Sequence, residues 1–310
     1  MVLCIPIKAP LKQDPILTKH PNRKKFIMQN GDQIAFVSCS NGLKTQQKKT
    51  LLKLHDFLTG LNITTRPENH IYAQDGIFSG TAQQRASTLM QCYLNPDIKA
   101  IFDVSGGDIA NEILPYLNFE VLAQSEATFW GYSDLTTIIN ALYTKTGKAS
   151  VLYQPRNLIL DPSGKRRKEF QHFITRGSKE LFTYHYRFIQ KKQMDGILVG
   201  GNIRCLLKLA GTAFWPDMTN KILLLESLHG TIPQMTAAFS QLKQIGVFEQ
   251  LNGVLLGQFT QMESEKIQPD MITLAQRFVP ENLALAKTDE IGHAPDAKAA
   301  IIGAPISLKS

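Results

Sequence analysis

Cysteine is scarce in this 310-residue sequence, and long apolar runs are missing. The four cysteines form no CxxC pair and none lies near a histidine at zinc-ligand spacing, which disfavours a disulfide framework and a zinc site. Such usage is typical of a reducing compartment. No run approaches the roughly 18 apolar residues of a membrane span, and residues 1–15 lack the pattern of a signal peptide. We therefore expect a cytoplasmic protein without a membrane segment.

Motifs for several kinds of cofactor chemistry are also missing. There is no HExxH or comparable pattern, which disfavours a metallopeptidase. Neither GxGxxG nor the P-loop pattern occurs, which disfavours a site for a dinucleotide or a nucleoside triphosphate. The formal net charge is +8, but short basic runs are scattered along the chain without a nucleic-acid-binding signature. We interpret them as solvated surface and expect no metal and no nucleic-acid partner.

The composition that is present is typical of a globular protein, with 43% hydrophobic and 19% charged residues. At roughly 100–200 residues per domain, the length predicts two domains. Composition changes at 155–192, where proline, glycine and basic residues dominate. We place a linker region at 161–192, between an N-terminal domain of residues 1–160 and a C-terminal domain of residues 193–310.

Apolar runs of strand length alternate with helical patterns along the chain. Residues 33–38, 99–104 and 127–130 predict buried strands, and helical stripes or capping boxes lie between and after them. This alternation predicts an α/β fold, with a parallel sheet covered by helices on both faces. Open sheets of this kind bind ligands at the carboxyl ends of their strands.

Ser133 lies where a predicted strand turns directly into a helix, in the sequence Trp130-Gly-Tyr-Ser-Asp134. Such a Gly-x-Ser turn exposes the hydroxyl at the edge of the sheet, beside the free N–H groups and positive dipole of a helix N-terminus. Both would stabilise an oxyanion. The simpler interpretation is a helix cap, which is a frequent role of serine. The GxSxG elbow of α/β-hydrolases does not match, because residue 135 is leucine.

A nucleophilic serine needs a base, usually a histidine held by a carboxylate. Among seven histidines, His293 lies in a loop of small residues from which an imidazole can project. Glu226 directly follows the apolar run 222–225, where a buried carboxylate would need a partner. The simpler interpretations are a surface histidine and a solvated strand end.

Two diglycines, Gly106-Gly107 and Gly200-Gly201, each follow an apolar strand and precede a helix. Glycine at such positions lets another backbone or a ligand approach closely.

Together these motifs resemble the LD-carboxypeptidase family, which also contains the microcin C self-immunity peptidases. The resemblance extends from about residue 31 to 305, and its ordered combination of blocks is specific. The blocks are Asn30-Gly-Asp32, Ser79-Gly-Thr-Ala82 with Arg85, residues 95–102 with Gly106-Gly107, GYSD at 131–134, Gly200-Gly201-Asn202, residues 222–226 and Gly292-His293.

The resemblance implies a serine carboxypeptidase in which Ser133 attacks the scissile carbonyl, His293 transfers the proton and Glu226 orients His293. It implies an oxyanion hole made by the backbone N–H groups of Gly107 and Asp134. It also implies a Rossmann-like N-terminal domain with a parallel sheet, a smaller β-rich, barrel-like C-terminal α/β domain, and an active site between them. Family members are commonly homodimers and need no cofactor, so we expect both properties here.

Departures from the family pattern leave the substrate open. Ser105 stands where many members carry arginine, Ser227 follows Glu226 where an acidic residue is frequent, and Tyr153-Gln-Pro155 replaces a usual Gly-Pro. The main hypothesis is hydrolysis of the L,D-peptide bond before a terminal D-amino acid of murein peptides, as in peptidoglycan recycling. The alternatives are an immunity peptidase that cuts peptidyl-nucleotide amide bonds, and a non-catalytic α/β ligand-binding protein.

Overall fold

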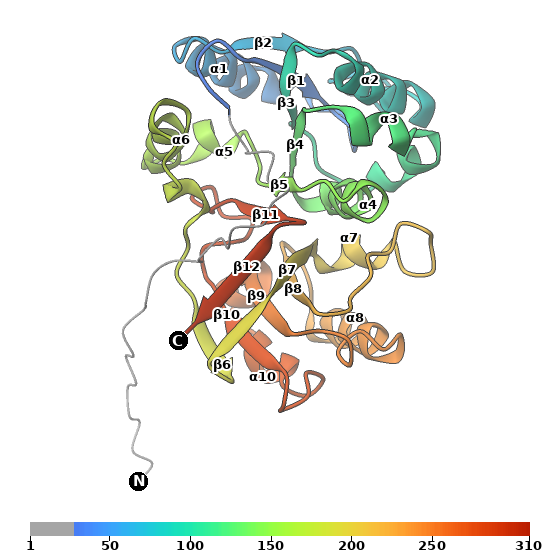
Figure 1. Ribbon diagram of the computed structural model, residues 1–310, viewed down its shortest axis with the longest axis vertical. Helices are drawn as coiled ribbons and strands as arrows, with labels where there is room; N and C mark the ends of the chain where they lie inside the picture. Colours follow the sequence, from blue (N-terminus) through green and yellow to red (C-terminus); the bar gives the residue numbers. More distant parts are fainter. Residues whose placement is uncertain (1–27) are drawn as a thin grey trace.

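The computed structural model describes residues 28–310, which form two sheets with their own helices (Figure 1). The expectation about a signal peptide lies outside these residues. Within residues 28–310, no helix is both long and apolar enough to cross a membrane.

The first sheet has six strands in the order β11-β5-β4-β3-β1-β2. Neighbouring strands are parallel except at the edge, where β11 runs antiparallel to β5. The predicted parallel sheet is confirmed, since a helical crossover after each strand returns the chain in the same direction. The strands are β1 (Gln33–Val37), β2 (Thr64–Pro67), β3 (Ile98–Asp103), β4 (Thr128–Gly131), β5 (Ser150–Leu152) and β11 (Ala300–Ile302).

Helices cover both faces of this sheet, as predicted (Figure 1). Because side chains alternate along a strand, Ile34 and Phe36 of β1 join one apolar core while Ala35 and Val37 join the other. The helices on the Phe36 face are α1 (Lys48–Thr59), α5 (Asn157–Leu160) and α6 (Lys165–Arg176). Those on the opposite face are α2 (Ala82–Leu94), α3 (Phe119–Gln124) and α4 (Thr136–Thr146).

The second sheet also has six strands, in the order β12-β7-β8-β9-β10-β6. Its four central strands are parallel and its two edge strands antiparallel. The predicted second α/β domain, rich in strands and curled, is therefore confirmed (Figure 1). The strands are β6 (Arg187–Gln190), β7 (Gln193–Asn202), β8 (Lys221–Ser227), β9 (Gly253–Phe259), β10 (Ala284–Lys287) and β12 (Pro305–Lys309).

The two faces of the second sheet have different partners. Leu223 and Leu225 pack into a core with the helices of this domain, whereas Ile222 and Leu224 join the core that contains α4 of the first domain. The inner face of the second sheet therefore packs against the first domain. The helices are α7 (Ile203–Leu207), α8 (Ile232–Gln244), α9 (Thr260–Ser264) and α10 (Met271–Ala275).

Two connections between the sheets are themselves ordered. Residues 161–192 contain α6, the 3₁₀ helix η4 (Glu180–Phe182) and β6. Farther along the chain, a loop of residues 288–299 leaves β10 of the second sheet and enters β11 of the first. This loop carries His293, so the crossing places that residue between the two sheets.

Candidate active site

Ser133 lies in a tight turn between β4 and the 3₁₀ helix η3 (Ser133–Leu135), which leads into α4. Its φ is 57°, in the left-handed region that residues with a side chain rarely adopt. Gly131 permits this turn, because a Cβ at that position would lie 2.8 Å from the Cβ of Leu135. The cap position of η3 belongs to Tyr132, not to Ser133. The helix-cap interpretation is therefore wrong, and Ser133 instead occupies a strained backbone conformation of the kind that is frequent at functional sites.

The imidazole of His293 reaches the serine from the second sheet. Its Nε2 lies 3.0 Å from the Oγ of Ser133. Gln258 of β9 holds the loop, since its side-chain amide donates to the carbonyl of Asp289 at 2.6 Å. A Cβ at Gly292 would overlap the Gln258 side chain, so glycine is required for this close packing. The His293 side chain is only 10% exposed, which rules out a free surface histidine.

Glu226 approaches the other side of the same imidazole. Its Oε2 lies 2.7 Å from the Nδ1 of His293, and its side chain is fully buried. The close approach of β9 leaves room only for glycine at position 257, where a Cβ would lie 3.0 Å from the Glu226 Cβ. The interpretation of Glu226 as a solvated strand end is therefore wrong.

Tyr132 closes the site around the imidazole. Its ring stands edge-on to that of His293, with centroids 4.9 Å apart and an interplanar angle of 68°. Burial raises the pKa of the Tyr132 hydroxyl well above its usual value, and the negative charge of Glu226 raises it further. The phenol therefore stays neutral beside the buried Glu226 carboxylate and the His293 ring.

The diglycine after β3 lies against the loop that follows β1. Gly107 has a φ of 137°, and a Cβ there would overlap the side-chain amide of Asn41. That amide oxygen accepts the backbone N–H of Asp108 at 3.0 Å. The conformation of Gly107 is thus fixed by packing, and only glycine fits. Its backbone N–H and that of Asp134 stay predicted oxyanion donors.

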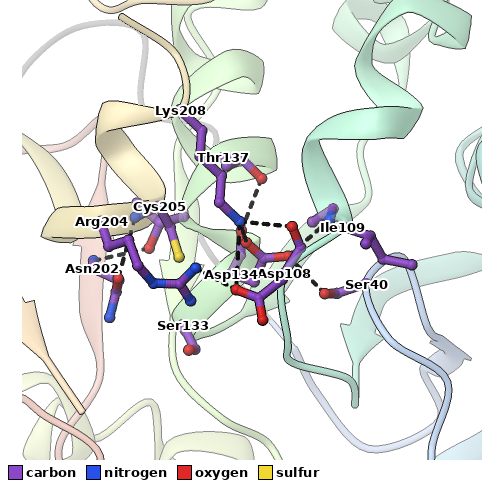
Figure 2. Close-up of polar contacts among 12 residues, drawn as sticks. Ser40, Asp108, Ile109, Ser133, Asp134, Thr137, Asn202, Arg204, Cys205 and Lys208 are labelled. Carbon is purple, nitrogen blue, oxygen red and sulfur yellow. Dashed lines mark hydrogen bonds and ion pairs between the residues drawn. The ribbon is translucent and has the colours of Figure 1, made fainter. Parts of the chain in front are cut away.

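The carboxylate of Asp134, directly after Ser133, joins several segments around the nucleophile turn (Figure 2). It is fully buried. One oxygen accepts the Ser40 hydroxyl at 2.7 Å and the Ala110 N–H at 2.8 Å. The other lies 2.5 Å from the ammonium of Lys208, which belongs to the second domain. Sequence reasoning assigned only the backbone N–H of Asp134 a role and missed both its side chain and Lys208.

The second diglycine lets the first domain pack against the second. The Gly200 N–H donates to the side chain of Asn140 on α4, and Asn140 donates back to the Gly200 carbonyl, both at 2.9 Å. The N–H of Asn202 donates to the Thr136 hydroxyl at 3.0 Å. A Cβ at Gly201 would lie 2.7 Å from that hydroxyl. The expectation of a close backbone approach is confirmed, and its partner is the helix that follows Ser133.

Thr136 and Asn140 were also missed from the sequence. Their spacing of four residues on α4 was an available signal, because such residues share one face of a helix. Nothing in the sequence indicated that this face meets a second diglycine 60 residues later.

The arrangement of these three side chains is compatible with nucleophilic chemistry. A hydroxyl, an imidazole and a buried carboxylate lie in series, an arrangement that activates a hydroxyl for attack on a carbonyl. Within residues 28–310, no three histidine, cysteine or acidic side chains gather as a metal site would require.

Comparisons with known proteins point to the same family over both domains. Residues 34–153 match the LD-carboxypeptidase N-terminal domain, and residues 195–308 match the LD-carboxypeptidase C-terminal domain. Over 303 residues, the chain is 24% identical to a probable murein peptide carboxypeptidase of Bacillus subtilis, with 93% of this chain and 92% of that protein covered.

Two further similarities concern a microcin immunity protein. The chain is 25% identical over 262 residues to the microcin C7 self-immunity protein MccF of Escherichia coli, with 73% of this chain and 75% of that protein covered. A structure of MccF in complex with glutamyl sulfamoyl guanosine has the same fold, with a TM-score of 0.79, 21% identity and coverage of 92% of this chain and 99% of that one. The chain therefore belongs to the LD-carboxypeptidase family and is, as its sequence predicted, a serine-type carboxypeptidase.

Proposed function

We propose that the protein hydrolyses an amide bond by means of a catalytic triad formed by Ser133, His293 and Glu226. The observation that carries this proposal is the pair of contacts through one imidazole, 3.0 Å from Nε2 to the serine oxygen and 2.7 Å from Nδ1 to the carboxylate. A carboxylate beside Nδ1 favours the tautomer that carries its proton there, which leaves Nε2 facing the serine oxygen. The three groups come from both sheets, which argues against an accidental local cluster.

In this mechanism, the Glu226 carboxylate holds the proton of His293 on Nδ1 and leaves Nε2 free to accept one. Ser133 loses its proton to Nε2 as its oxygen attacks the scissile carbonyl, and Glu226 stabilises the imidazolium that forms. His293 then gives that proton to the leaving amine, which leaves an acyl-enzyme. Water then attacks the carbonyl of the acyl-enzyme, and His293 takes its proton and returns it to the Ser133 oxygen. The acyl part of the substrate leaves as a free acid. The backbone N–H groups of Gly107 and Asp134 stabilise the oxyanion.

The substrate that we propose is a murein peptide that ends in a D-amino acid, cut at the L,D bond before that residue. The similarity to a murein peptide carboxypeptidase over more than nine-tenths of both chains supports this choice. A peptidyl-nucleotide is the second candidate, because the fold also matches an immunity protein in complex with an aminoacyl sulfamoyl nucleoside. The homodimer and the cytoplasmic location belong to the same proposal.

The test compares the parent with Ser133→Ala on two substrates. Release of D-alanine from a murein tetrapeptide and release of the nucleotide from a peptidyl-nucleotide are measured by chromatography. We expect turnover of the tetrapeptide to fall by about three or more orders of magnitude in Ser133→Ala, while circular dichroism shows a folded protein.

The matched control is Ser264→Ala, which changes an exposed serine of α9 and should leave turnover unchanged. Preferential release of the nucleotide would support the second substrate. A parent that is inert on both substrates, or a Ser133→Ala variant as active as the parent, would favour the non-catalytic ligand-binding protein instead.

A further inference from the structure

Arg156 lies on a short segment that spans the end of β4, from which Ser133 projects. The segment follows β5, the neighbour of β4 in the first sheet. The side-chain amide of Gln154 donates to the carbonyl of Ser105 at 3.1 Å, and Ser105 directly precedes the first diglycine. The segment therefore reaches from β5 to the end of β3, past the turn that holds the nucleophile.

The same segment also contacts the histidine loop. Asn157, next to Arg156, donates its side-chain amide to the carbonyl of Ala294 at 3.2 Å. Ala294 directly follows His293 in the sequence. The residues on either side of Arg156 therefore contact both the start of the predicted oxyanion loop and the loop that carries His293.

The guanidinium of Arg156 lacks a full partner for its charge. Its Nε–H donates to the amide oxygen of Gln154 at 3.2 Å, and no carboxylate of residues 28–310 forms an ion pair with it. The carboxylate whose negative charge acts on it is that of Asp103. Both oxygens of that carboxylate are already occupied, since one accepts the N–H and hydroxyl of Ser105 and the other the N–H of Cys39.

Burial acts against this cation without removing its charge. It lowers the pKa of Arg156, and the negative charge of Asp103 partly offsets the effect. Arginine nevertheless keeps its proton in proteins. A half-buried guanidinium with free N–H groups is available to an anion, and its planar fork matches the two oxygens of a carboxylate.

Two other cations near the nucleophile are already neutralised. Lys208 contacts the carboxylates of Asp134 and Asp108, and Arg204 forms an ion pair with Asp108 (Figure 2). Because these carboxylates already pair with Lys208 and Arg204, neither cation is free to bind a substrate anion. Arg156 has no such competitor among the described residues.

We propose that Arg156 binds the negatively charged group next to the scissile amide, on the part of the substrate that leaves. For a murein peptide, this group is the terminal carboxylate of the D-amino acid. For a peptidyl-nucleotide, it is the phosphoryl group. Both present oxygens in a fork that a guanidinium can bind with two N–H groups. The inference rests on the proposed function. It adds that the Arg156 guanidinium selects substrates whose leaving part carries a negative charge.

Kinetics of a matched substrate pair test this role. A murein tetrapeptide with a free terminal carboxylate is compared with the same peptide ending in a carboxamide. In Arg156→Met, we expect kcat/KM for the free acid to fall by about 10- to 100-fold, through KM, as is typical for the loss of a charged hydrogen bond. The kcat/KM for the carboxamide should change by less than about threefold. The variant should therefore lose most of the preference for the acid that the parent shows.

Two variants and one further substrate sharpen the test. Arg156→Lys keeps the charge without the fork and should recover part of the preference. Arg66→Met, at an exposed arginine of the edge strand β2, changes net charge equally and should not alter the preference between acid and carboxamide. If only turnover of a peptidyl-nucleotide depends on Arg156, the anion that it binds is the phosphoryl group. Equal losses on acid and carboxamide, or no loss on any substrate, would overturn the inference.

A binding experiment separates this inference from the proposed function. The dissociation constant of each tetrapeptide is measured by calorimetry with Ser133→Ala and with Ser133→Ala/Arg156→Met. Weaker binding of the acid alone in the double variant supports the role of Arg156 even if the parent does not hydrolyse the peptide. Identical binding by the two variants overturns that role even if the parent is an active peptidase.

Discussion

The ammonium of Lys208 lies 2.5 Å from a carboxylate oxygen of Asp134, although the two residues belong to different domains. Asp134 follows Ser133 directly, and its carboxylate also accepts hydrogen bonds from Ser40 and Ala110. The second domain thereby contacts the turn that presents the nucleophile. This contact depends on the packing of the two domains, as does the approach of His293.

Lys208→Met should destabilise the protein more than an ordinary surface change. The substitution leaves the fully buried carboxylate of Asp134 without a cation, and loss of one partner of a buried pair costs about 3–5 kcal/mol. Because the Lys208 side chain is 19% exposed, we expect a smaller decrease in the free energy of unfolding, of about 2–3 kcal/mol. Urea denaturation followed by fluorescence measures it.

Arg204→Met is the matched control for Lys208→Met, since its ion pair with Asp108 is more than half exposed on both sides and should contribute about 1 kcal/mol or less. Adding Asp134→Asn to Lys208→Met removes the unpaired charge and should recover part of the lost stability. Equal effects of Lys208→Met and Arg204→Met would contradict the importance of the buried contact.

Gly107→Ala should reduce turnover strongly, whereas Gly106→Ala should not. A Cβ at position 107 overlaps the Asn41 amide and requires a φ of 137°, so the loop must shift. Displacement of one oxyanion donor lowers kcat by about 100- to 1,000-fold. At position 106 a Cβ meets no atom within 4 Å. Steady-state kinetics of the two alanine variants, with matched circular dichroism spectra, check this; similar kcat values would remove Gly107 from the oxyanion hole.

Asp161→Asn should flatten the dependence of stability on acid pH. Burial alone would raise the pKa of Asp161, but hydrogen bonds from the Arg166 N–H and from the N–H and hydroxyl of Ser163 outweigh it and lower the pKa below its usual value. A lowered folded pKa gives stability that is present above the unfolded value of about 3.9 and is lost as pH falls through the folded value.

The expected difference between the parent and Asp161→Asn is about 1 kcal/mol at pH 7, because hydrogen bonds to charged groups are stronger than those to neutral ones. It should shrink below about pH 4, as the parent loses its charge. Urea midpoints from pH 7 to pH 3 measure it, with the exposed Asp97→Asn as control. A difference that stays constant over this range would show that the charge of Asp161 does not stabilise the start of α6.

The sequence indicated much of the local structure. The run before Gly131 became β4, the alternation of strand and helix became a parallel sheet, and Gly200-Gly201 became the point of close backbone approach. It could not predict that β11, near the end of the chain, completes the edge of the first sheet, because pairing between distant strands leaves no local pattern.

By itself, the amino-acid sequence indicated the α/β class and the turn at Ser133, since strand length and glycine placement are local properties. The resemblance to the family, carried by the ordered motifs, then implied Glu226 and His293 as the partners of Ser133. Only the tertiary structure decided that one imidazole lies between the other two groups, that Lys208 neutralises Asp134 and that Arg156 keeps free N–H groups. Distances, burial and the neutralisation of charge depend on which distant segments contact each other. Those contacts are set by the packing of the two sheets and not by spacing along the chain.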